Sequence, residues 1–215
     1  MTGYLKYWRK LEKLLIQTSY LSPEYNVNTV NIEERLQNLR GELADLRRVG
    51  GYFTVIGGAR HAAQIMFIGK APGEKEAKSG RPFVGRAGQV LNELLSSIGL
   101  DRDSVYVTNI VKDRPPKNRD PKPEEIELYG PLLDEQIESM KPKVIATLGR
   151  FSMEYVMRRY GLDEKIQAIS DLHGKVLISS KGFRFVPLFH PAAAIYNQSL
   201  KPTLFEDFKV LKTLI

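Results

Sequence analysis

Cysteine is absent from the 215 residues of this sequence. Without thiols the chain cannot form disulfides, hold zinc or an iron–sulfur cluster through sulfur, or use a thiolate nucleophile. The sequence also lacks an uninterrupted apolar run of about 18 residues, the length that crosses a bilayer. The N-terminus does not show the charged, apolar and small-residue order of a signal peptide, so we expect an intracellular, cytoplasmic protein without a membrane partner.

Positive charge is in excess, with 32 Lys and Arg residues against 25 Asp and Glu residues and a formal net charge of +7. This excess favours an anionic partner such as nucleic acid, although a basic protein without such a partner is also consistent with charge alone. Hydrophobic residues make up 42% of the chain, enough for the core of one main domain with a smaller appendage.

The first 60 residues differ from the rest and predict a helical extension. After a break at Ser22-Pro23, Asn31 and Glu34 form a plausible capping pair for a second helix. Its apolar stripe repeats at intervals of three and four and comprises Ile32, Leu36, Leu39, Leu43 and Leu46. Such a stripe packs on a main domain or on a partner helix, and about two heptads are too few to indicate a coiled coil. We therefore expect residues 1–60 to pack on a main domain of residues 61–215, with a protein partner as the alternative.

From residue 64 onward, apolar runs typical of strands alternate with segments of helical spacing. The expected strands are residues 65–68, 105–108, 144–148 and 185–189, and the expected helices are residues 89–98, 123–140, 151–160 and 204–214. This alternation predicts an α/β three-layer sandwich, in which a four-stranded parallel sheet is flanked by helices. Ligands of such sheets bind beyond the carboxyl ends of the strands.

Glycine-rich segments follow the first expected strand. Residues 69–73 read GKAPG, and residues 80–88, which open the next helix, read GRPFVGRAG. Glycine lets the backbone approach a ligand closely, and the N–H groups at a helix start can meet a carbonyl or a phosphate. The spacing matches neither a P-loop nor a Rossmann fingerprint, which disfavours a nucleotide cofactor.

Two polar residues end the second and fourth expected strands. Asn109 carries a planar amide that suits the edge of a pyrimidine, and a turn-forming role is its alternative. His190 would lie beside Asn109 if the two strands were neighbours, although a lone histidine at a strand end is more often structural than catalytic.

The ordered set of these segments resembles the motif series of family-4 uracil-DNA glycosylases. The series comprises Gly69–Gly73, Gly80–Gly88, Thr108-Asn109 with Arg114-Pro115-Pro116, Thr147-Leu148-Gly149-Arg150, and His190-Pro191. The strings GRPFVGRAG and NRDPKPEEI are its most specific parts, and the resemblance covers residues 64–215. It implies a four-stranded parallel sheet and an enzyme that flips uracil into a pocket at the strand ends.

The resemblance also implies roles for individual residues. His190 would lie near the uracil O2, Asn109 would bind the Watson–Crick edge, and Phe83 would stack on the base. Glu76 matches the position that narrows the pocket against the methyl group of thymine. The implied catalytic residues are His190, Asn109 and Lys70, and the implied base pocket comprises Gly69, Ala71, Pro72, Gly73, Glu76, Phe83 and Asn109.

Contacts to DNA are implied in two places. The segment after His190-Pro191 matches the loop that fills the gap left by the base, with Ala194 and Ile195 as DNA contacts and Ile195 as the apolar wedge. Basic residues offer candidate phosphate contacts, and the alternative for each is a solvated surface charge. These candidates are Arg86, Lys112, Arg114, Lys117 and Arg119.

The sequence departs from the family pattern at two points. The first loop of the family reads Gly-Glu-Ala-Pro-Gly with a Glu associated with activity, whereas this chain has Lys70, which cannot accept a proton from attacking water as a carboxylate would. Typical members also bind a four-iron, four-sulfur cluster through four cysteines. The downstream pair of those positions falls on Asp113 and Tyr129, and the upstream pair falls near Glu42 and Asp45. We therefore expect no cluster, no other metal and no cofactor.

Two functions are consistent with these features. The first is a monofunctional glycosylase of base excision repair, which hydrolyses the N-glycosidic bond of uracil or a related deaminated base in DNA. The alternative is a catalytically inert relative that binds DNA or, through its N-terminal helices, a replication or repair protein. The set of Phe83, Asn109, Glu76 and His190 favours the first, and Lys70 with the missing cysteines favours the second.

Overall fold

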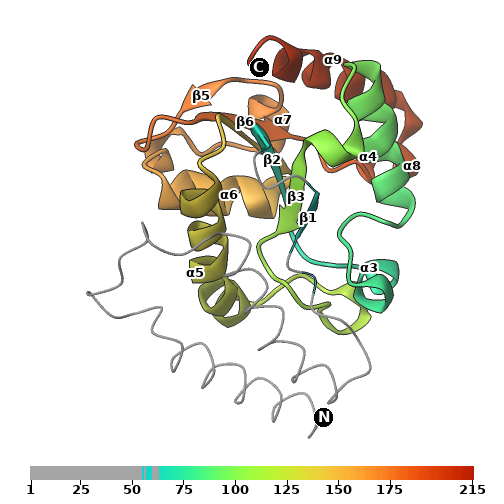
Figure 1. The fold of residues 1–215 in the computed structure, drawn as a ribbon, viewed down its shortest axis with the longest axis vertical. Coiled ribbons are helices and arrows are strands. Elements are labelled where there is room, and N and C mark those ends of the chain that lie inside the picture. Colours follow the sequence, from blue (N-terminus) through green and yellow to red (C-terminus); the bar gives the residue numbers. More distant parts are fainter. Residues whose placement is uncertain (1–54, 56, 60–62) are drawn as a thin grey trace, which may run out of the picture.

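The computed structural model describes residues 55, 57–59 and 63–215, and within them a mixed sheet forms the centre (Figure 1). The strand order is β1-β3-β2-β4-β6-β5. The strands are β1 Gly58–Ala59, β2 Ile65–Gly69, β3 Tyr106–Asn109, β4 Val144–Leu148, β5 Leu177–Ile178 and β6 Arg184–Leu188. The strands β3, β2, β4 and β6 are parallel, which confirms the predicted sheet. The two-residue strands β1 and β5 add antiparallel edges that the sequence did not predict.

Helices connect the strands and cover the sheet on both faces (Figure 1). The α-helices are α3 Glu74–Ser79, α4 Arg86–Ser97, α5 Pro123–Met140, α6 Arg150–Arg159, α7 Ile169–Leu172, α8 Ala193–Tyr196 and α9 Lys201–Lys212. Single 3-10 turns lie at η2 Arg102–Ser104, η3 Pro116–Asn118, η4 Asp163–Lys165 and η5 Gln198–Leu200. The four predicted helices correspond to α4, α5, α6 and α9, with boundaries that differ by three residues or fewer.

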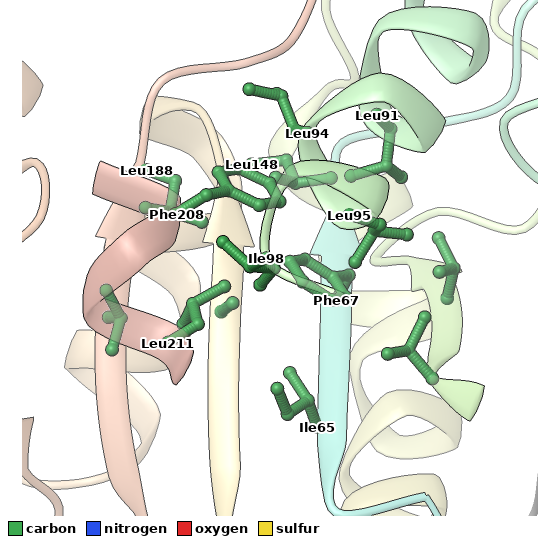
Figure 2. Close-up of a cluster of buried hydrophobic side chains, with 14 of the residues drawn as sticks. Ile65, Phe67, Leu91, Leu94, Leu95, Ile98, Leu148, Leu188, Phe208 and Leu211 are labelled. Carbon is green, nitrogen blue, oxygen red and sulfur yellow. The ribbon is translucent and has the colours of Figure 1, made fainter. Parts of the chain in front are cut away.

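Successive residues of each central strand enter different cores. In β2, Ile65 and Phe67 pack with α4 and α9, whereas Met66 and Ile68 pack with α5 and α6. Figure 2 shows the first core, in which the ring of Phe208 in α9 stacks on Phe67 with 5.8 Å between the ring centroids. Burial on both faces explains why the strands are continuous apolar runs rather than alternating ones.

Local signals set the boundaries of α5, the longest helix that is described. Pro123 occupies the first turn, where its missing N–H costs nothing, and Glu125 accepts a 2.8 Å hydrogen bond from the N–H of Lys122. The helix ends at Met140 because Lys141 takes a left-handed conformation with φ of 46° and Pro142 follows.

The predicted N-terminal helices lie outside the described residues, so the helical extension and the domain boundary at residue 60 stay predictions. Val55 contacts the segment after β3, where its N–H donates to the carbonyl of Lys112 at 2.8 Å. None of the helices that are described has the length and apolar character of a membrane span.

Candidate active site

A cavity of about 430 Å³ lies at the carboxyl ends of the parallel strands. Three segments that are far apart in the sequence line it: the loop after β2, the end of β3 with its basic loop, and the segment after β6. Most of the predicted pocket residues are among its walls, namely Lys70, Ala71, Pro72, Gly73, Glu76, Phe83, Asn109 and His190. The carboxyl ends of parallel strands lie at the same edge of a sheet. The cavity therefore lies where α/β sheets generally bind their ligands.

Asn109 is the last residue of β3 and is 2% exposed. Its Oδ1 atom is buried and has no hydrogen-bond partner within the described protein. A buried acceptor without a partner is costly, so this atom is suited to a ligand that brings a donor. Gly69 pairs with Asn109 across the sheet, and a Cβ at position 69 would lie 2.4 Å from this oxygen, so a side chain there would displace the amide.

Phe83 forms an aromatic wall of the cavity and has a φ of 51°, which is unusual for a residue with a side chain. Its ring centroid lies 5.7 Å from that of His190. Gly88 at the start of α4 allows this conformation, because a Cβ there would meet the carbonyl oxygen of Phe83. The position of the ring therefore depends on the backbone packing at Gly88 as well as on its own side chain.

Glu76 of α3 lines the cavity and anchors the turn that carries Phe83. Its Oε1 atom accepts hydrogen bonds from the N–H groups of Val84 at 2.9 Å and Gly85 at 2.8 Å. One carboxylate oxygen thus fixes the backbone between Phe83 and α4. Narrowing of the pocket against thymine remains a prediction for this residue.

His190 follows β6 and is a neutral imidazole at pH 7. Burial in the cavity wall is the main reason that its pKa falls to about 4, and the positive charge of Lys70 lowers it further. Its Nδ1 atom accepts a 3.1 Å hydrogen bond from the N–H of Ala192, so the proton of the neutral ring is on Nε2. The side chain can therefore donate one hydrogen bond without carrying a charge.

Asn109 and His190 do not come from neighbouring strands, since β2 and β4 lie between β3 and β6. They meet instead as two walls of one cavity. Gly149, between β4 and α6, gives His190 room, because a Cβ at that position would lie 3.2 Å from the Cβ of the histidine.

Lys70 brings a positive charge to the cavity wall. Its Nζ atom lies 2.7 Å from Oδ1 of Asp120 and 5.2 Å from the ring centroid of Phe151. Arg150 lies over the same ring and approaches Oδ2 of Asp120 at 3.5 Å. The hydrogen bond from Lys70 lowers the pKa of Asp120, so the carboxylate stays ionised beside the two cations.

The prediction that Lys112 contacts phosphates is wrong. This side chain is fully buried, and its Nζ atom donates to Thr108 Oγ1 at 2.9 Å, to the Asn109 carbonyl at 2.7 Å and to Gln136 Oε1 at 2.7 Å. Three acceptors around one amine hold it in the protein interior, and Lys112 is not among the residues that line the cavity. Burial lowers the pKa of Lys112 to about 7.

The other basic residues predicted to contact phosphates differ in their exposure and in the partners they already have. Arg86 and Lys117 are exposed. Arg114 is partly buried and donates hydrogen bonds to Asn118 and Glu74. Arg119 forms a bidentate ion pair with Glu125, with N–O distances of 2.6 and 2.8 Å. Arg86 occupies the first turn of α4, where a cation is unfavourable for the helix itself, so its position suits an anionic partner.

The predicted wedge segment folds as the short helix α8. Ala194 is 6% exposed and packs in the core, so it offers little surface for the DNA contact that the resemblance implies. Ile195 is only partly exposed. The next residue, Tyr196, lines the cavity, is 89% exposed and was missed from the sequence. Tyr196 follows Ala192 by one helical turn, and this spacing could have indicated that both residues line the cavity.

Asp113 and Tyr129, at two of the implied cysteine positions, lie in contact with each other. The Tyr129 hydroxyl donates to Oδ2 of Asp113 at 2.6 Å. A direct hydrogen bond thus links the two segments that a cluster would have joined. In the described part of the chain, no three His, Asp or Glu side chains gather as they would around a metal ion.

Comparisons with known proteins agree with this geometry. Residues 57–210 match the family model of the uracil DNA glycosylase superfamily. A type-4 uracil-DNA glycosylase of Sulfurisphaera tokodaii is 47% identical over 156 residues, which is 71% of this chain and 70% of the relative. A type-4 uracil-DNA glycosylase of Archaeoglobus fulgidus is 39% identical over 188 residues, which is 84% of this chain and 94% of the relative. One of Thermotoga maritima is 40% identical over 163 residues, covering 75% of this chain and 82% of the relative.

Proposed function

Because the chain belongs to the uracil DNA glycosylase superfamily, we propose that it is a DNA repair glycosylase that hydrolyses the N-glycosidic bond of uracil in DNA. The observation that carries the proposal is the buried Oδ1 atom of Asn109, an acceptor without a partner that faces a cavity walled by Phe83 and His190. Uracil presents an N3–H donor beside its O4 acceptor, which is the complement of an amide. Cytosine presents an acceptor at N3 and a donor at N4, and therefore fits this orientation poorly.

The chemistry proposed for this site is stabilisation of the departing base. As the bond between N1 and C1′ breaks, negative charge grows on the uracil O2, and Nε2–H of His190 donates to it. Lys70 adds a positive charge nearby, while water captures the cationic sugar. A neutral donor is suited to this step because it needs no proton at neutral pH, and the low pKa of His190 keeps it in that form.

The surrounding residues complete the proposal. Glu76 would exclude thymine, Arg86 and Lys117 would contact phosphates, and Tyr196 would enter the gap that the base leaves. Uracil-containing DNA is the substrate and a related deaminated base is a further candidate, so we place the protein with the chromosome inside the cell. A protein partner that binds the N-terminal helices also stays a proposal.

The experiment is excision from an oligonucleotide with a single uracil, followed by alkali and detection of strand scission. His190→Ala should lower the excision rate by on the order of a hundredfold, the effect of removing one preorganised donor, while affinity for DNA stays within a few-fold because phosphates carry most of it. His190→Gln is the matched control, since its amide keeps a donor and should retain more activity. An unchanged rate in both variants would move the active site away from His190.

Asn109→Ala tests recognition in the same assay. Removal of the amide should reduce the preference for uracil over cytosine, because no other predicted group reads the base edge. A variant that loses rate but keeps its full preference would show that Asn109 does not read the base.

An inert DNA-binding relative is the second candidate, and the ion pair of Lys70 with Asp120 is the observation that favours it. In that case the parent protein would bind duplex DNA but release no base from a panel of deaminated lesions. Lys70→Glu in the same panel would then show whether the charge reversal limits turnover.

A further inference from the structure

We propose that Lys70 is a nucleophile toward the abasic product: its amine forms an imine with the C1′ aldehyde of an abasic deoxyribose in the cavity and so promotes cleavage of the strand. This inference rests on the proposed function, since hydrolysis of the base leaves such a sugar. It adds a covalent step to a chain that the sequence predicts to be monofunctional.

Lys70 has the position that this reaction requires. It is the single lysine among the described residues that line the cavity, and its side chain is 31% exposed. Its backbone is fixed at the end of β2, because Ile110 and Val111 donate to the carbonyls of Gly69 and Lys70 at 3.0 and 3.1 Å. Movement of Nζ therefore requires only rotation of the side chain.

Lys70 and His190 line the same cavity. After burial, the charge of Lys70 is the largest cause of the lowered pKa of His190. His190 is the group proposed to meet the uracil O2, and only C2 and N1 separate that oxygen from C1′. An amine in the same cavity as the imidazole is thus placed to approach the carbon that becomes the aldehyde.

The contacts of Nζ do not prevent its movement. Its ion-pair partner Asp120 has a side chain that is 56% exposed, and ion pairs that are this exposed contribute little to stability. Lys112 gives the contrast, because it is fully buried, has three acceptors and does not line the cavity. Of these two lysines, only Lys70 can reach a sugar.

The proposed step needs no oxidant or reductant. The lone pair of the neutral Nζ forms a bond to C1′ of the ring-opened sugar, and the electron pair of the carbonyl π bond moves to oxygen, which takes up a proton. Loss of water then gives an imine that is protonated on nitrogen. This imine acidifies C2′–H, so a proton passes to water and the C3′–O bond breaks, with its electron pair leaving on the 3′ phosphate. Hydrolysis of the imine restores the amine of Lys70.

The test uses duplex DNA with a preformed abasic site, from which the enzyme that made it has been removed. The full chain is incubated with this DNA and sodium borohydride, which reduces an imine to a stable amine, and the covalent adduct is measured on a denaturing gel. Lys70→Arg keeps the charge near Asp120 but provides no nucleophilic amine at neutral pH, so trapping should fall on the order of tenfold or more. Mass spectrometry of the wild-type adduct should place the sugar on Lys70.

Lys75→Arg is the matched control, since Lys75 is an exposed lysine of α3 outside the cavity lining and should leave trapping unchanged. Equal trapping by Lys70→Arg and the parent, an adduct on another lysine, or no adduct at all would overturn the inference. Because this DNA already lacks the base, the result is independent of excision. Trapping without uracil release would contradict the proposed function alone, and release without trapping would contradict this inference alone.

Discussion

The ammonium group of Lys112 has three hydrogens, and the fold supplies one acceptor for each of them. These acceptors are the Thr108 hydroxyl, the Asn109 carbonyl and the Gln136 side chain. Gln136 is itself placed by Tyr106, whose hydroxyl accepts from its Nε2 atom at 3.1 Å. Since the network includes the backbone of Asn109, it helps to fix the residue that is proposed to read the base. The hydrogen bonds offset only part of the cost of burying a charge, as the low pKa of Lys112 indicates.

The titration of Lys112 predicts a pH dependence of stability. The amine has an ordinary pKa of 10.5, to which it returns in the unfolded chain, and a pKa of about 7 in the fold. Between these values the unfolded chain binds more protons than the folded one, so the free energy of unfolding should rise with pH. One such group contributes a slope of at most about 1.4 kcal/mol per pH unit.

Denaturant unfolding of the parent and of Lys112→Met between about pH 7 and 9.5 checks this prediction. The difference between the two curves isolates Lys112, because the other groups titrate in both proteins. The parent should gain stability with pH relative to the variant. Parallel curves would show that the buried amine does not lose its proton in this range.

At the scale of elements, the short helix α8 determines which of its residues are exposed beside the cavity. Its turn directs Ala194 into the core and leaves the ring of Tyr196 exposed at the rim of the cavity. An exposed aromatic ring beside a base pocket is suited to stack in the duplex after the base has left. Tyr196 therefore replaces Ile195 as the proposed wedge.

Tyr196→Ala should lower uracil excision from duplex DNA by roughly tenfold, since a stacked ring contributes about 1–3 kcal/mol. The loss on single-stranded uracil DNA should be much smaller, because that substrate has no opposing stack to hold open. Tyr196→Phe keeps the ring and is the matched control. Equal losses on both substrates would indicate that Tyr196 acts in the pocket rather than in the duplex.

The elements that the sequence predicted correctly are those with a long, regular signal. Apolar runs identified the four parallel strands, and Pro123 identified the start of α5. The edge strands β1 and β5 have two residues each, too few for any periodicity to appear. They form at the two outer edges of the parallel strands, where β1 pairs with the distant strand β3 and β5 pairs with β6, the next strand along the chain.

The site was predictable to a similar extent. The motif series predicted that Asn109, Phe83 and His190 share one site, and all three line the same cavity. The burial of Lys112 could not be predicted, because its acceptors include Gln136, which is 24 residues away on α5. From the sequence alone, a lysine in a basic loop is expected to be exposed, because the acceptors that bury it come from the tertiary structure.

At the scale of the whole molecule, the two ends of the sheet differ in the cations and the cavity that they offer to a ligand. The cavity opens at the carboxyl ends of the strands, and the exposed cations Arg86, at the start of α4, and Lys117, in η3, adjoin the lining residues Ala87 and Asn118. Exposed lysines also occur at the amino ends, such as Lys143 directly before β4 and Lys181 before β6. Of the two pairs, we expect only Arg86 and Lys117 to meet the phosphates of a DNA whose base enters the cavity.

This difference predicts how binding depends on salt. The affinity for uracil-containing duplex DNA should fall steeply with salt, since each phosphate that a cation neutralises releases a counterion. Replacing Arg86 and Lys117 together by Ala should lower the slope of log affinity against log salt by roughly one to two units. Replacing Lys143 and Lys181 by Ala removes the same charge from the far end and should leave the slope nearly unchanged. Fluorescence anisotropy over a salt series measures all three slopes, and equal losses in both double variants would mean that net charge, rather than the site, determines binding.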